Sequence, residues 1–150
     1  MLDARWEYRN WRRKGHMHVD YAFICDYAEA KDKVNAIGIG FDRIYATKVP
    51  ARHPHFSVVT QLKFSRTEAG IKDIQIHLID ADGNEIIPPI NRKLQVKTPA
   101  GTLLETTARL VVEFGHVEFK IYGDYSVKVN IGTQEVVSIP LSIMQPPITA

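Results

Sequence analysis

The sequence predicts an all-β domain: a sandwich of two antiparallel sheets, immunoglobulin-like, with about seven to nine strands. From Val19 onward, apolar and polar residues alternate with period two, which is the pattern of half-buried strands. Turn residues separate these alternating segments, and no segment carries a sustained apolar stripe of helical period. A small β-barrel would leave much the same pattern, so that alternative stays open.

The first expected strand contains Cys25, whose side chain shares a face with those of Tyr21, Phe23 and Tyr27. The second expected strand covers 35–41. Its larger apolar residues would face the core, so its opposite face would carry only the small residues Ala36, Gly38 and Gly40. Since a strand gains nothing intrinsically from glycine, such a face indicates close approach by a side chain, a ligand or another subunit.

The later strands follow from the same alternation and are expected at 55–64, 74–78, 107–114, 117–121, 126–131 and 137–143. The Asp-Gly pair within 80–84 predicts a hairpin turn, because both residues tolerate positive φ. The inward set changes from even to odd residues at Gly115-His116, so a turn or bulge is expected there. The segment 88–101 looks like a long connection.

Two residues near the end of the chain have predicted structural roles. Tyr125 stands at the entry to a late strand, where immunoglobulin-like sandwiches often use a tyrosine hydroxyl to tie the corner to nearby backbone. Pro140 cannot donate to a ladder, so the last strand is expected to be an edge or to be paired on one side there.

The composition, with 45% hydrophobic and 24% charged residues, is that of a soluble globular protein. No apolar run is long enough to span a bilayer, and no secretory signal is visible. The lone cysteine excludes an intrachain disulfide, which favours the cytoplasm. We expect a basic leader at 1–16, one domain at 17–145 and a short tail at 146–150.

The leader carries a net charge of +3, whereas the whole chain carries +2. The remaining residues are therefore slightly acidic. Two interpretations of the leader are open. It is either a segment without a role, as an inert tail or a stretch upstream of a true start at Met17, or an arm that contacts nucleic acid through arginines and aromatics. The domain lacks a basic stripe of its own, so nucleic acid is not the expected partner of the domain.

The chemistry-bearing residues each have a structural interpretation. Cys25 is expected to be an inert core thiol. The pairs His16/His18 and His53/His55 have the spacing of metal ligands on a strand, but no third ligand follows at a suitable spacing. The acidic turn at 80–84 has its glycine in the wrong place for a calcium loop. No catalytic constellation is recognised, and neither a metal nor another cofactor is expected.

Several strings are similar to those of a known family. Val19-Asp20-Tyr21-Ala22-Phe23-Ile24-Cys25-Asp26-Tyr27-Ala28 opens the similarity, and the strings around His53-Pro54, 64–70, 78–83 and 123–140 continue it. The chain thus resembles, over 19–143, a bacterial family of small proteins catalogued as a domain of unknown function. The resemblance implies a compact β domain of the bacterial cytoplasm and assigns no functional residue.

We therefore expect a non-catalytic module that binds a protein partner or associates with itself. The candidate interface residues are Ala36, Gly38, Gly40, Ser138, Pro140 and Ser142. The alternative is a small-ligand-binding protein or an enzyme, which would need a concave pocket where polar groups converge. The candidate pocket residues are Asp26, Asp42, Arg43, His53 and Arg66.

Overall fold

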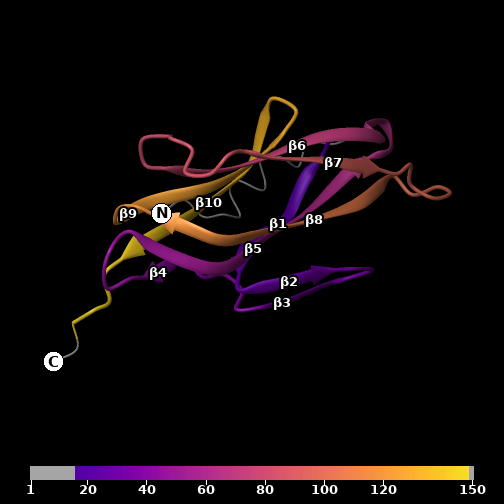
Figure 1. Cartoon of the computed structure of the whole chain (residues 1–150). Coiled ribbons are helices and arrows are strands. Elements are labelled where there is room, and N and C mark those ends of the chain that lie inside the picture. Colours follow the sequence, from indigo (N-terminus) through magenta and orange to yellow (C-terminus); the bar gives the residue numbers. More distant parts are fainter. Residues whose placement is uncertain (1–15, 149–150) are drawn as a thin grey trace.

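The computed structural model describes residues 16–148, and its regular structure is almost entirely β (Figure 1). The predicted leader therefore lies, except for His16, outside the described residues. The strands are β1 (His18–Cys25), β2 (Tyr27–Ala30), β3 (Val34–Ile37), β4 (Arg43–Tyr45), β5 (Ala51–Ser65), β6 (Gly70–Asp80), β7 (Ile90–Val96), β8 (Glu105–Phe119), β9 (Gly123–Ile131) and β10 (Gln134–Met144). A single turn of 3-10 helix, η1 (Arg66–Glu68), joins β5 to β6.

The strands form two principal sheets and one hairpin. The three-stranded sheet has the order β1-β5-β8, and the five-stranded sheet has the order β4-β10-β9-β6-β7. All ladders are antiparallel except the short one between β4 and β10. The β2–β3 hairpin lies on the side of the three-stranded sheet that faces away from the five-stranded one (Figure 1). The predicted all-β fold is confirmed.

The main core fills the space between the two sheets. The inward residues of β5 and β6 are almost completely buried, as their alternation predicts, and they include Phe56, Leu62, Phe64, Ile74 and Leu78. The rings of Phe56 and Phe114 stack across the β5–β8 ladder with centroids 4.7 Å apart. Burying side chains of this size contributes roughly 1.5–3 kcal/mol each, so this layer supplies most of the driving force for folding.

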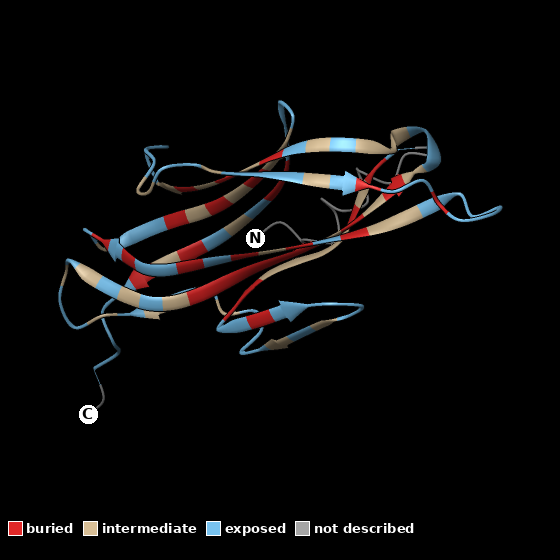
Figure 2. Ribbon diagram, turned by 45° about the vertical axis from the view of Figure 1, so that its right-hand side comes forward, coloured by how far each residue is buried: buried red, intermediate tan, exposed pale blue. Residues whose placement is uncertain are grey.

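A second, smaller core lies on the outer face of the three-stranded sheet. It is made of Cys25, Ala28 and Val59, with Tyr21 and Phe23 packed at its margin. The β2–β3 hairpin covers this face, and Ala28 is the buried residue of an otherwise largely exposed hairpin (Figure 2). Cys25 is buried, as predicted, but in this outer cluster rather than between the sheets.

The hairpin also explains a departure from the predicted pattern in β5. Ser57 and Val59 alternate with the inward residues and so lie on the opposite face of β5 from Phe56, yet both are fully buried. The alternation correctly assigns them to the outer face, but it gives no information about a separate hairpin packing on that face. Ser57 Oγ has no hydrogen-bond partner among the described residues, which fits a polar group trapped beneath an apolar layer.

The turns and edges agree with several predictions. Asp80 Oδ1 accepts hydrogen bonds from the backbone amides of Asp82 (3.0 Å) and Asn84 (2.9 Å), which forms the predicted hairpin turn. Tyr125 donates its hydroxyl to the carbonyl of Ile121, as expected for a tyrosine corner. In β10, Pro140 lies opposite Ser126 of β9 and has no ladder partner on its other side within 16–148, so the strand is paired on one side there, as predicted, but the edge of the sheet is β4.

Three expectations about local structure are wrong. The connection expected at 88–101 contains β7, a polar edge strand paired with β6. The chain does not turn at Gly115-His116, because β8 continues through these residues in one register with β5. The inward set changes from even to odd residues at His116, which has a φ of 52°. The strand expected at 35–41 ends at Ile37, so Gly38 and Gly40 belong to a turn.

Candidate functional site

The β2–β3 hairpin returns to the end of β1 and brings a glycine turn beside Asp26. The amide of Asp26 donates to the carbonyl of Ile37 (2.9 Å), and the amide of Gly40 donates to the carbonyl of Ile24 (2.8 Å). Gly38 and Gly40 have φ values of 69° and 83°, in the left-handed region that favours glycine. A Cβ at Gly38 would lie 2.6 Å from Cγ of Asp26, so only glycine lets the turn approach the carboxylate this closely.

Strand β4 forms the second wall of the site. Its parallel ladder with the end of β10 is extended by backbone hydrogen bonds from Ser142 to Asp42 and from Ala46 to Met144, each 2.8 Å long. Ile44 packs against the main core, so alternation directs its neighbours Arg43 and Tyr45 to the outer side. A hydrogen bond with the Tyr45 side chain raises the pKa of Arg43, and its guanidinium keeps its charge.

His53, near the start of β5, forms the third wall. Its ring lies between Phe41 and Phe56, with centroids 6.3 and 5.9 Å away. Its Nε2 atom is covered and has no hydrogen-bond partner among the described residues. Burial lowers the pKa of His53, and the opposing effects of a backbone hydrogen bond at His55 and of the Asp26 charge are smaller. The imidazole is therefore held in its neutral form.

These three walls line an open hollow of about 640 Å³. Three of the five predicted pocket residues line it: Asp26, Arg43 and His53. The remaining lining residues are both glycines of the turn together with Ile39, Phe41, Ile44 and Tyr45. The volume is within the range of small-molecule sites, but the hollow is shallow and open rather than enclosed.

The other two predicted pocket residues do not line the hollow. Asp42 lies at its border, with a carboxylate oxygen 3.9 Å from Nε of Arg43. Arg66 is engaged elsewhere: its Nη2 donates to the carbonyls of Gly101 and Leu103, both at 2.7 Å, and so holds the connection before β8. Its role is structural.

The candidate interface residues separate into two groups. Ala36 packs on the outer core while Gly38 and Gly40 line the hollow, so they do not form the continuous small-residue face of a strand. Ser142 pairs with Arg43 in the β4–β10 ladder and therefore borders the hollow, and its hydroxyl donates to Asp124. Ser138 and Pro140 are exposed further along the β10 edge.

A set of exposed apolar side chains, which we call the apolar rim, lies in the hollow and on the strand ends beside it. Its members are Tyr27, Ile37, Ile39, Tyr45 and Met144. Tyr27 lies opposite Ile37 in the β2–β3 ladder, and Tyr45 lies opposite Met144 in the β4–β10 ladder. Ile39 and Tyr45 also line the hollow itself. The sequence interpretation missed this rim because it directed Ile37 and Ile39 into the core. The φ preference of the intervening glycine is the signal that would have ended the strand.

The remaining histidines form no metal centre. Nδ1 of His55 donates to the carbonyl of Asp26 (2.8 Å), and its Nε2 lies 3.8 Å from the Glu113 carboxylate. His77 bonds to Gln75 and Glu85. Between residues 16 and 148, no group of three or more His, Cys, Asp or Glu side chains is arranged to hold a metal ion.

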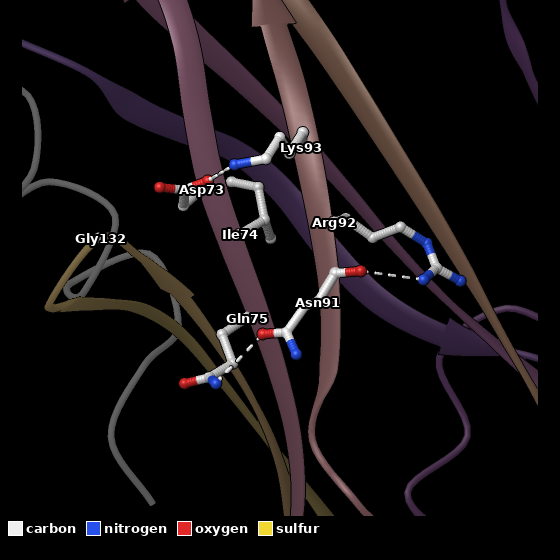
Figure 3. A pocket seen from close by; sticks show the side chains of 7 residues that line it. All are labelled: Asp73, Ile74, Gln75, Asn91, Arg92, Lys93 and Gly132. Atoms are coloured by element: carbon white, nitrogen blue, oxygen red, sulfur yellow. Dashed lines mark hydrogen bonds and ion pairs between the residues drawn. The ribbon is translucent and has the colours of Figure 1, made fainter.

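A second hollow, of about 500 Å³, lies over β6 and β7 (Figure 3). Its polar groups bond to one another: Lys93 pairs with Asp73, and Gln75 donates to Asn91 (3.2 Å). Both interactions join directly opposed residues of the β6–β7 ladder. They are the cross-strand pairs that stabilise an exposed sheet face, and they occupy these four polar side chains with one another.

Within the described range, no helix has both the length and the apolarity to cross a bilayer. No curated protein sequence matches the chain. A family model matches residues 20–144, which include β2 to β10 and nearly all of β1. The chain therefore belongs to the family of unknown function DUF6941.

Proposed function

We propose that this domain is a non-catalytic binding module, and that its apolar rim and the hollow beside it bind a protein partner. One observation carries the proposal: five of the ten large apolar side chains exposed in the described part of the chain gather in the rim. Single exposed apolar residues are normal on a soluble protein, whereas a contiguous group of them marks an interaction site. Ile39 and Tyr45 share the hollow, Met144 lies opposite Tyr45, and the Tyr27–Ile37 pair adjoins the lining residues Asp26 and Gly38 in the chain.

The shape of the site favours a protein segment over a free small molecule. Much of the apolar surface, including Ile37 at 69% exposure, lies outside the hollow and would stay uncovered around a small ligand. A peptide could place one bulky apolar side chain in the hollow and lay its neighbours on the rim. The Asp26 carboxylate and the Arg43 guanidinium would then select polar groups beside that anchor.

The groups around the hollow do not favour catalysis. The thiol of Cys25 is buried in the outer core, and burial, followed by the Asp26 charge, raises the pKa of Cys25. Nε2 of His53 is covered, so this atom cannot exchange a proton with a substrate in the hollow without a rearrangement. We also propose a bacterial cytoplasmic location, which the lone, buried thiol and the family resemblance support.

The proposal can be tested without knowing the natural partner. Peptides selected from a random displayed library against the folded protein should bind wild type and lose at least about tenfold in affinity to Ile39→Lys. The matched control is Ile71→Lys, because Ile71 is equally exposed (64% against 60%) but belongs to β6. Amide NMR shifts of the bound protein should map to the hollow. Equal binding to both variants, or shifts confined to other strands, would contradict the proposal.

A second candidate function rests on the convergence of Asp26, Arg43 and His53 in one hollow. These groups suit a small ligand with an apolar body and an acidic group that pairs with Arg43. An NMR screen with small aromatic carboxylates distinguishes the two functions. Ligand binding predicts saturable shifts at the hollow that Arg43→Ala abolishes and Ile37→Lys leaves unchanged, because Ile37 lies outside the hollow.

A further inference from the structure

The edges of the two sheets are protected to different degrees. An unpaired edge strand offers a row of free backbone groups, and natural proteins blunt such edges with proline, charge or bulges. The side of β10 that its short ladder with the terminal strand β4 leaves free carries Pro140, and the β7 edge carries Arg92 and Lys93 in an exposed run. The β1 edge is interrupted by a register shift between Val19 and Tyr21. Each of these three edges therefore has a recognisable protective feature.

The β8 edge differs from these edges because its regular part has no register shift and the exposed charges Arg109 and Glu113 have opposite signs. Strand β8 is 15 residues long and contains neither proline nor lysine. It pairs with β5 on one side and, within 16–148, has no ladder on the other. Its backbone stays regular from Glu105 to Gly115, and only His116, at positive φ, interrupts it. This is a long and regular edge with which no other described strand pairs.

The outward side chains of β8 are complementary to a second copy of themselves. Arg109 and Glu113 are exposed on the outer face, and Val111 lies midway between them. In an antiparallel pair of two β8 strands related by a twofold axis at Val111, Arg109 of each copy lies opposite Glu113 of the other. Opposite charges at directly opposed positions stabilise a strand pair. Val111 would meet its own copy on the axis.

Other registers lose this complementarity. Moving the axis by one residue places Arg109 or Glu113 opposite Val111 of the second copy and leaves no ion pair. Moving the axis by two residues places Arg109 opposite Arg109, or Glu113 opposite Glu113, and like charges at directly opposed positions are destabilising. The register centred on Val111 pairs Thr107 with Gly115, so all its paired residues lie within the regular segment. Charge complementarity selects this register.

The present contacts of the two charged residues leave capacity for a partner. Nε of Arg109 donates to Gln61 (2.8 Å), and a guanidinium retains further donors at its terminal nitrogens. Glu113 lies 3.8 Å from the His55 ring through one of its two oxygens. From this edge and its charges, we infer that the protein forms a twofold dimer in which two β8 strands pair antiparallel around Val111. The two three-stranded sheets then join into one continuous sheet.

This dimer uses a different surface from the apolar rim, so it stands or fails independently of the proposed function. Sedimentation equilibrium of the full chain should show a monomer–dimer equilibrium. Arg109→Glu should raise the dissociation constant at least about tenfold, because it opposes like charges twice in each dimer. Glu113→Arg should act in the same way, and the double variant Arg109→Glu with Glu113→Arg should restore dimerisation. Circular dichroism checks that each variant folds.

The other outcomes overturn the inference. A monomer at every accessible concentration excludes the dimer, and a dimer that Arg109→Glu leaves intact lies elsewhere. Dissociation by Ile39→Lys, with no effect of Arg109→Glu, would assign the interface to the apolar rim. A full chain that is monomeric but dimerises after removal of residues 1–15 would show that the N-terminal segment occupies the edge. Arg92→Glu, on the protected β7 edge, is the control and should change nothing.

Discussion

The hydroxyl of Tyr125 donates a 2.7 Å hydrogen bond to the backbone carbonyl of Ile121, four residues earlier in the chain. The ring is buried and meets Phe119 edge to face, with centroids 5.0 Å apart. This one side chain therefore fixes the path of the connection from β8 to β9. Because β8 and β9 belong to different sheets, this hydrogen bond helps to hold the connection by which the chain crosses from one sheet to the other.

Replacing Tyr125 by phenylalanine should keep the packing and remove only the hydrogen bond. We expect Tyr125→Phe to lower the free energy of unfolding by about 1 kcal/mol, since an intramolecular hydrogen bond contributes roughly 0.5–1.5 kcal/mol net. Urea unfolding followed by fluorescence measures the change. Tyr27→Phe is the control, because Tyr27 is half exposed on the hairpin and its variant should unfold like wild type. Equal midpoints for all three proteins would show that the corner does not stabilise the fold.

A second prediction concerns the glycine turn. Gly38→Ala and Gly40→Ala both place a side chain at positive φ, which costs roughly 1–2 kcal/mol. Only the methyl group at position 38 would overlap the Asp26 carboxylate, because the space beside Gly40 is open. Gly38→Ala should therefore lower the unfolding midpoint more than Gly40→Ala does. Asp26→Ala should remove the difference, and a double-mutant cycle in urea measures the coupling.

The thiol of Cys25 should report whether the β2–β3 hairpin is docked. Burial, and then the Asp26 charge, raises the pKa of Cys25, and the sulfur is fully covered. Alkylation of the folded protein by iodoacetamide should then be slower than that of the urea-unfolded chain by on the order of a hundredfold. Ala28→Asp, which buries a charge beneath the hairpin, should accelerate the reaction without global unfolding. Glu29→Ala is the control on the exposed side of β2. If Ala28→Asp reacts at the wild-type rate, the hairpin does not gate the thiol.

The sequence predicts well those features that neighbouring residues determine. The alternation in β5 and β6, the Asp80 turn and the Tyr125 corner each depend on a few adjacent residues and on the faces of one strand. The same logic places Cys25 on an apolar face. It does not specify which apolar layer covers that face, because that depends on how a distant hairpin packs.

Features that depend on long-range pairing could not be predicted in this way. Strand β7 carries Asn91, Arg92 and Lys93 in succession, so it shows no alternation, and its pairing with β6 defines it. Strand β4 has three residues and is a strand only through its parallel ladder with β10. The convergence of Asp26, Arg43 and His53 could be suggested from residue type, but their walls come from the ends of three different strands.

His53 should make the stability of the protein depend on pH. Its folded-state pKa is lowered, mainly by burial, below the ordinary value of 6.5. Below pH 6.5 the unfolded chain binds a proton that the folded chain binds only at lower pH, so stability falls as the pH drops through this window. Well above pH 6.5 both states are neutral and the effect vanishes.

The variant His53→Phe tests this effect and the cost of the unpaired ring nitrogen together. A phenyl ring fits between the two aromatic neighbours Phe41 and Phe56 and has no polar atom to desolvate. The variant should be as stable as wild type or more stable at pH 7.5, because removing a buried unpaired polar atom relieves a penalty of about 1–3 kcal/mol. Its advantage over wild type should grow between pH 7.5 and pH 5. Urea titrations at several pH values measure this difference in stability.

His116→Asn, which removes an exposed imidazole at a positive φ that asparagine tolerates, is the control and should keep the wild-type pH dependence. A pH dependence that is the same in His53→Phe and wild type would show that His53 is not held neutral by the fold.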